Sequence, residues 1–98
     1  MITIYQINSD KDINNVAFLP YRFLKEFDFS IYDEVWSGVV DEPGLDGVYE
    51  KFNLDRPLDF KGHSLSVSDI VQIEEPDSES NGYYFCDSIG WVKLDIIK

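Results

Sequence analysis

His63 is the only histidine in this chain of 98 residues, and its neighbours include the groups from which a hydrolytic centre could be assembled. Ser64 and Ser66 follow it closely, and Asp69 or Asp87 could orient its ring as the acid of a Ser-His-Asp arrangement does. No nucleophile-elbow motif supports this interpretation, and such residues occur together in many sequences. We therefore predict no catalytic residue, and a small hydrolase or nuclease that uses His63 is the alternative.

Cys86 is the only cysteine, which excludes an internal disulfide bond and a cysteine-based zinc site. It stands between Phe85 and Asp87 in an apolar stretch, so we interpret it as a buried structural residue. The acidic loop at residues 74–79 could bind calcium weakly, but it lacks the D-x-[DN]-x-[DN]-G spacing of a calcium loop. We expect neither a metal site nor a cofactor.

The charge of the chain is strongly negative, with 19 acidic residues, 8 basic residues and a net charge of −11. This balance argues against a protein that binds nucleic acid by neutralising phosphates, and against docking on an anionic membrane. Residues 28–59 carry nine acidic and two basic residues, a net charge of −7. Two explanations are open: the acidic residues keep a small protein soluble, or they form a docking surface for a basic protein.

The docking hypothesis concerns a partner such as a nucleic-acid-processing enzyme, whose basic groove would accept carboxylates in place of phosphates. We expect the domain to be a monomer or a weak dimer. The residues predicted to contact the partner are Asp33, Glu34, Asp41, Glu42, Asp46, Glu50, Glu74, Glu75, Asp77 and Glu79.

Hydrophobic patterning supplies the elements that must position these residues. Leu45, Val48, Tyr49 and Phe52 recur at helical spacing, and Pro20 precedes a shorter apolar helical pattern. Stretches rich in β-branched and aromatic residues predict strands. The helices are expected at residues 20–27 and 45–53, and the strands at residues 1–7, 32–40, 68–74, 83–88 and 91–97.

This order of elements predicts an α+β fold, a single small domain over residues 1–98. The expected architecture is a mainly antiparallel sheet of about five strands with two short helices. The first residues lack the basic start and apolar stretch of a signal peptide, and no apolar run approaches the length of a membrane span. We therefore expect a cytoplasmic location.

Two segments, GHSLSVSDIVQI at residues 62–73 and YYFCDSIGWVKL at residues 83–94, resemble the YodL-like family, small domains of Firmicutes mobile and conjugative elements. The opening ITIYQI, the central YDEVWSG and the later LDGVYEKFN stand in the order of that family, so the resemblance covers nearly the whole chain. The positions that match the family pattern are Gly62, His63, Ser64, Leu65, Ser66, Ser68, Asp69, Asp87, Ser88 and Gly90.

The resemblance brings no catalytic residue, and we interpret the matching positions as structural. Ser66, Ser68 and Asp69 can hydrogen-bond backbone groups where the chain enters a strand, and Gly62 and Gly90 can supply turns. The family setting implies a role in helping a mobile element persist or evade host defence. We therefore predict a non-enzymatic interaction module for a basic protein, and a structural accessory domain is the second alternative.

Overall fold

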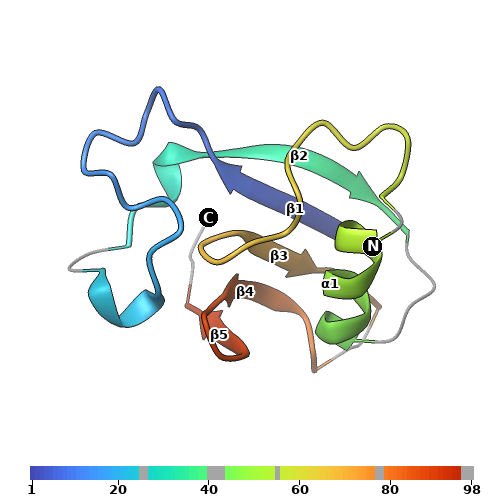
Figure 1. Cartoon of the computed structure of the whole chain (residues 1–98). Helices are drawn as coiled ribbons and strands as arrows, with labels where there is room; N and C mark the ends of the chain where they lie inside the picture. Colours follow the sequence, from blue (N-terminus) through green and yellow to red (C-terminus); the bar gives the residue numbers. More distant parts are fainter. Residues whose placement is uncertain (25–26, 40–43, 55, 77–78, 96–98) are drawn as a thin grey trace.

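The computed structural model describes residues 1–24, 27–39, 44–54, 56–76 and 79–95. Within these ranges five strands form one sheet in the order β2-β1-β3-β4-β5, with every neighbouring pair antiparallel (Figure 1). The strands are β1 (Ile2–Ile7), β2 (Tyr32–Gly38), β3 (Ile70–Ile73), β4 (Gly82–Cys86) and β5 (Trp91–Leu94). The helical elements are α1 (Gly44–Leu54) and two single 3₁₀ turns, η1 (Tyr21–Phe23) and η2 (Phe29–Ile31). The predicted five-stranded antiparallel sheet is confirmed.

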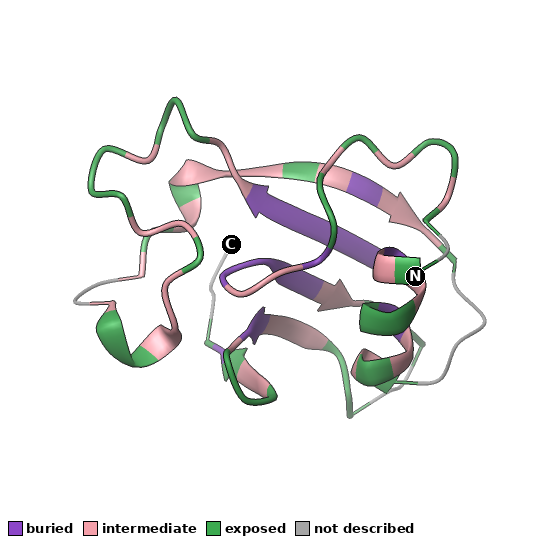
Figure 2. Ribbon diagram, in the orientation of Figure 1, coloured by how far each residue is buried: buried purple, intermediate pink, exposed green. Residues whose placement is uncertain are grey.

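Side chains on the two faces of the sheet belong to two separate hydrophobic clusters, because successive strand residues point to opposite faces. On one face, Ile2 and Ile4 pack against Val48 and Phe52 of α1. Figure 1 shows α1 and the segment 56–69 over this face, and Figure 2 shows that β1 is the most continuously buried strand. On the other face, a cluster with Tyr5 at its centre packs against rings from the segment 21–32.

Helix α1 confirms the prediction made from helical spacing. Val48 and Phe52 are buried, whereas Tyr49 is 42% exposed at the border of the apolar face. The ring of Trp36 meets the ring of Phe52 edge to face at 5.0 Å, and its Nε1–H donates to Oδ1 of Asp59 at 2.8 Å. Trp36 is therefore a core residue whose polar atom is satisfied.

The helix predicted over residues 20–27 is wrong. Among the described residues of this range only Tyr21–Phe23 forms a 3₁₀ turn, and Leu24 is already extended; residues 25 and 26 lie outside the described ranges. The backbone N–H of Tyr21 donates to Oδ1 of Asp87, the residue directly after β4. This bond connects the turn to that strand. Phe23, an apolar residue of the expected helix, is 58% exposed. The local pattern competes here with tertiary packing, because Leu24, Phe27 and Phe29 pack against the hydrophobic cluster on this face of the sheet.

Several strand boundaries also differ from the prediction. The strand expected at residues 83–88 is β4, from Gly82 to Cys86, and the strand expected at residues 91–97 ends at Leu94, with residues 96–97 outside the described ranges. The strand expected at residues 32–40 ends at Gly38, and Val39 beyond it is 81% exposed. The strand expected from residue 68 begins at Ile70, because Ser68 has a positive φ of 84° that no regular strand accepts. Within the described ranges, none of the helices has the length and apolar character needed to cross a membrane.

Candidate functional site

Asp69 carries a carboxylate that is almost completely buried, with 1% of the residue exposed. It lies directly before β3 and across from Gln6, because β1 and β3 pair Tyr5 with Ile70. Its Oδ2 accepts the backbone N–H of Ser66 at 2.8 Å and Nε2–H of Gln6 at 3.0 Å. Burial raises the pKa of Asp69 to about 7, against the lowering effects of these bonds and of the nearby His63.

Gln6 joins β1 to the loop that carries His63. Its amide oxygen accepts the backbone N–H of His63 at 3.1 Å, and its Nε2–H donates to the carbonyl of His63 at 2.9 Å. A Cβ at Gly62 would lie 2.0 Å from Oε1 of Gln6. The structure therefore assigns Gly62 to close packing against Gln6, whereas Gly90 occupies the predicted turn with a φ of 76°.

His63 lies at the surface and makes its main ring contact with the backbone. Its Nδ1 is 2.7 Å from the carbonyl of Ser64, so Nδ1–H is the donor and Nε2 is left as the other polar ring atom. The hydroxyl of Ser66 donates to the same carbonyl at 2.8 Å. In the described part of the chain, no hydrogen bond joins His63 to Ser66, Asp69 or Asp87.

The two aspartates considered as the acid of the alternative hydrolytic arrangement lie in different surroundings. Asp69 reaches His63 only through Gln6, which contacts both residues. Asp87 instead accepts the backbone N–H groups of Tyr21 and Ser88, at 3.1 and 2.8 Å. Cys86 is buried as predicted, and burial raises the pKa of its thiol to about 12. The thiol is therefore a poor nucleophile near neutral pH.

Ser68 is a buried residue in a strained backbone conformation. Its φ of 84° is unusual for a residue with a side chain. Three hydrogen bonds hold it: its N–H donates to the carbonyl of Cys86, its carbonyl accepts the Tyr32 hydroxyl, and its Oγ accepts the N–H of Phe18. Phe18 also has a positive φ, of 67°, so this bond connects two strained residues.

Two variants separate the strain at Ser68 from its side-chain hydrogen bond. Ser68→Ala removes the acceptor of the Phe18 N–H and keeps the strain, whereas Ser68→Gly removes both. We expect the glycine variant to be more stable than the alanine variant by about 1 kcal/mol, because glycine accepts a positive φ without steric cost. Urea unfolding of both variants measures the difference, and equal midpoints would contradict a strained Ser68.

A cavity of about 200 Å³ lies beside this network. Its walls come from the end of β1, the following loop, and the His63 loop: Ile7, Ser9, Ala17, Phe18, His63, Ser68 and Asp69. The ring of Phe18 lies 5.6 Å from the ring of His63. The family-like motif pointed to His63, Ser68 and Asp69. Phe18 carried no comparable sequence signal, because its position depends on the fold of a long loop.

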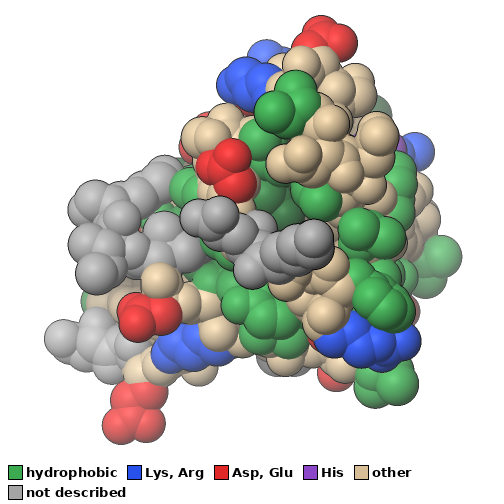
Figure 3. All heavy atoms as spheres, turned by 90° about the vertical axis from the view of Figure 1, so that its left-hand side faces the viewer, with side chains coloured by type: hydrophobic (Ala, Val, Ile, Leu, Met, Phe, Trp, Pro, Cys, Tyr) green, Lys and Arg blue, Asp and Glu red, His purple; other side chains and the backbone are tan. Residues whose placement is uncertain are grey.

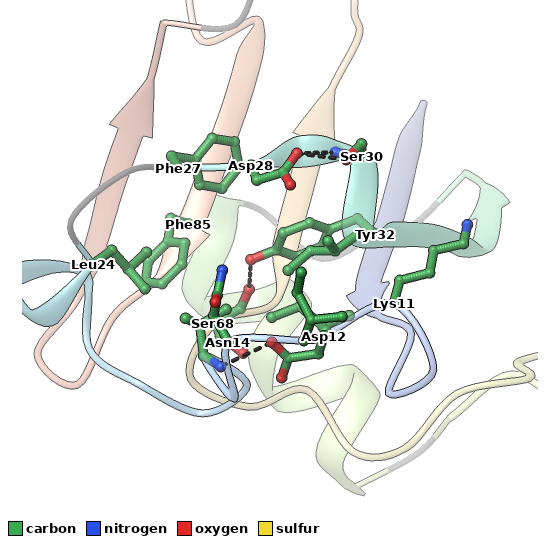
Figure 4. Close-up of a pocket in the computed structure, with 14 residues that line it drawn as sticks. Lys11, Asp12, Asn14, Leu24, Phe27, Asp28, Ser30, Tyr32, Ser68 and Phe85 are labelled. Carbon is green, nitrogen blue, oxygen red and sulfur yellow. Dashed lines mark hydrogen bonds between the residues drawn. The ribbon is translucent and has the colours of Figure 1, made fainter.

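A larger pocket of about 340 Å³ lies on the other side of Ile7 and Ser68, which line both spaces. Figure 4 shows Leu24 and Phe85 on one side, Lys11 on the opposite side, and the Tyr32 ring between them. Several of the polar groups here already have partners within the chain. Asp12 accepts two backbone N–H groups, from Val16 and Ala17, and Asp28 accepts from Ser30. The walls that remain available are mainly apolar.

The predicted partner-binding acids do not form one surface. Glu34 pairs with Tyr5 across the β1–β2 ladder. Burial raises the pKa of Tyr5, and the charges of Glu34 and Glu74 raise it further. Asp46 and Glu50 lie one turn apart on α1, which covers the opposite face of the sheet. The structure therefore separates the predicted acids into at least two groups.

The other predicted acids have different surroundings. Asp33 pairs with Lys11 at 3.0 Å and Glu75 with the N-terminal amine at 2.8 Å, and Glu79 is exposed. Asp41, Glu42 and Asp77 lie outside the described residues. The face shown in Figure 3, at the end of the sheet where the 8–31 segment lies, mixes acidic, basic and hydrophobic side chains. No group of three or more His, Cys, Asp or Glu residues that could hold a metal ion occurs in the described ranges.

Comparison with known proteins agrees with the resemblance seen in the motifs. The family model of the YodL-like domain matches residues 1–96 of the chain. Neither a curated protein sequence nor a solved structure matches it. Because the family model spans almost every residue, including both motif segments and α1, the chain belongs to the YodL-like domain family.

Proposed function

We propose that this α+β YodL-like domain is a non-enzymatic module that binds a basic protein through exposed carboxylates. The observation that supports the proposal is the excess of exposed acids without a cationic partner. Among the described residues, no ion pair involves the following exposed acids: Glu34, Asp46, Glu50, Glu74 and Glu79. A surface with this charge attracts a basic partner before contact and accelerates association, with strong dependence on salt.

The contact surface that we favour lies on the sheet face opposite α1. Glu34 and Glu74 both act electrostatically on Tyr5, and Glu74 also acts on Tyr83. Tyr5 itself is buried, whereas the neighbouring rings of Tyr83 and Phe29, whose centroids lie 5.6 Å apart, are partly exposed. Aromatic residues are favoured as anchors in protein interfaces, and charged residues around them set the orientation of the partner.

The chemistry of the partner follows from the acidic surface and the mobile-element setting that the family resemblance implies. A nucleic-acid-processing or host-defence protein has a basic groove that binds phosphates, and carboxylates could occupy this groove. In this proposal the domain acts in the cytoplasm as a monomer or weak dimer, and binds neither nucleic acid nor membrane directly.

Two double variants test the proposal, because each changes the net charge from −11 to −7 on a different face. Glu34→Lys with Glu74→Lys alters the proposed contact surface. Asp46→Lys with Glu50→Lys alters the exposed side of α1 and serves as the charge-matched control. We expect the first pair to reduce capture of a basic protein from a Firmicutes lysate by at least about tenfold at about 50 mM salt, and the second to reduce it far less.

Mass spectrometry of the captured proteins at low and at about 500 mM salt completes the experiment. A basic nucleic-acid-binding protein that the first pair loses, and that high salt releases, supports the proposal. If both double variants lost capture equally, the loss would be a general effect of net charge and would contradict the proposed contact surface. Capture that neither pair changes would contradict it and favour a structural accessory domain.

A further inference from the structure

The cavity beside Asp69 joins a solvent-exposed rim to a buried acidic floor. Ser9, Phe18 and His63 are exposed at the rim, whereas Ser68 and Asp69 are buried. Its volume of about 200 Å³ lies below the range of about 300–1,000 Å³ that is common for small-molecule pockets. The space therefore suits a group the size of one side chain.

Asp69 lines this cavity and carries an acceptor that no described residue uses. Both hydrogen bonds to its carboxylate end on Oδ2, and Oδ1 has no hydrogen-bond partner among the residues that the structure describes. A buried carboxylate oxygen without a partner is costly and uncommon in folded proteins. No Lys or Arg is among the residues that line the cavity. The raised pKa of Asp69 agrees with a carboxyl group whose burial outweighs the effects of its hydrogen bonds and of His63.

Two further groups define the chemistry of the missing donor. Because Nδ1–H of His63 donates to Ser64, the neutral ring keeps Nε2 as an acceptor at the rim. The exposed ring of Phe18, 5.6 Å from the His63 ring, offers an aromatic surface on the same rim. Two acceptors and an aromatic face suit a planar cation with several N–H donors, which describes a guanidinium better than an ammonium group.

We propose that this cavity binds a guanidinium group, with Oδ1 of Asp69 and Nε2 of His63 as acceptors and the ring of Phe18 as a stacking surface. The group comes either from an arginine side chain of a protein or from a free guanidinium compound. This site lies apart from the Glu34 and Glu74 surface, and it does not depend on the domain binding a basic protein.

The test uses four small probes and the intact 98-residue chain. Butylguanidinium presents the group alone, and N-acetyl-arginine methylamide presents it as a side chain. Butylammonium keeps the positive charge but lacks the planar set of N–H donors. Butylurea keeps the planar shape but carries no charge. Titrations followed by ¹H–¹⁵N NMR locate each probe through the amide shifts of Phe18, His63 and Asp69.

We expect butylguanidinium to shift these amides and to bind at least about tenfold more tightly than butylammonium or butylurea. Binding of the arginine derivative would identify a protein side chain as the source, whereas its exclusion would identify a free compound. Asp69→Asn, which keeps an acceptor for Ser66 and Gln6, should weaken binding at least about tenfold. Phe18→Leu should weaken it less, since only the stacking surface is lost.

Three results would overturn the proposal. The first is no shift at Phe18, His63 or Asp69 with butylguanidinium. The second is equal binding of butylurea, which would indicate a neutral polar cavity that holds water. The third is unchanged affinity in Phe18→Leu and Asp69→Asn, which would indicate diffuse attraction to the negative surface.

Discussion

Gly62→Ala is expected to lower the free energy of unfolding by about 2–3 kcal/mol, although it adds a single methyl group. The added Cβ would lie 2.0 Å from Oε1 and 2.9 Å from Cδ of Gln6, so the amide must move. The amide accepts from His63 and donates to Asp69, and its displacement leaves a buried carboxylate with one donor fewer. Urea or thermal unfolding measures the loss.

A double-mutant cycle with Gln6→Ala tests whether the clash with Gln6 is the cause. Gln6→Ala removes the obstructing atoms together with their hydrogen bonds, so Gly62→Ala in that background should cost less than about 1 kcal/mol. Gly90→Ala provides the control for the loss of glycine itself, because no heavy atom lies within 4 Å of its added Cβ. Its positive φ should cost about 1 kcal/mol. Equal effects of Gly62→Ala in both backgrounds would refute the explanation.

Asp69→Asn is expected to change how stability depends on pH. The pKa of Asp69 rises from its ordinary value of 3.8 to about 7 in the folded protein, because burial disfavours the charged carboxylate. Between these values the folded state keeps a proton that the unfolded state has lost. The contribution of Asp69 to stability is therefore greatest below about pH 4 and decreases as the pH rises to about 7.

The asparagine variant cannot lose this proton, so it should gain stability relative to the unchanged protein as the pH rises from about 5 to about 8. We expect a relative gain on the order of 2–4 kcal/mol, which follows from a shift of about three pKa units. His63, Tyr32 and Cys86 are the titratable groups that act electrostatically with Asp69, and the variant keeps all three. Urea unfolding at both pH values measures the gain. Parallel pH profiles would show that Asp69 is ionised in the folded protein throughout this range.

Elements with a strong and repeated pattern could be predicted from the sequence. The spacing of Val48 and Phe52 indicated α1, and the β-branched residues of Ile2–Ile7 indicated β1. The predicted helix at residues 20–27 rested on few apolar positions. There, the bond from Tyr21 to Asp87 and the packing of later rings on the sheet outweighed the local preference.

The candidate site could be predicted only in part. The motif resemblance pointed to His63, Ser68 and Asp69, and the interpretation of Ser68 as a partner of backbone groups agrees with its bond to Phe18. Gln6, which connects these residues, was not identified, because a glutamine within a strand carries no chemical signal of its own. Its role arises only when β1 pairs with β3 and places it across from Asp69.

The sequence by itself determined the net charge of −11, the strands and helix with clear periodicity, and the family. These properties depend on composition and on neighbours along the chain. Only the tertiary structure decided that the predicted acids lie on both faces of the sheet, and that the carboxylate of Asp69 is buried beside a cavity. Those features depend on strand register and on long loops, whose contacts join residues more than 50 positions apart.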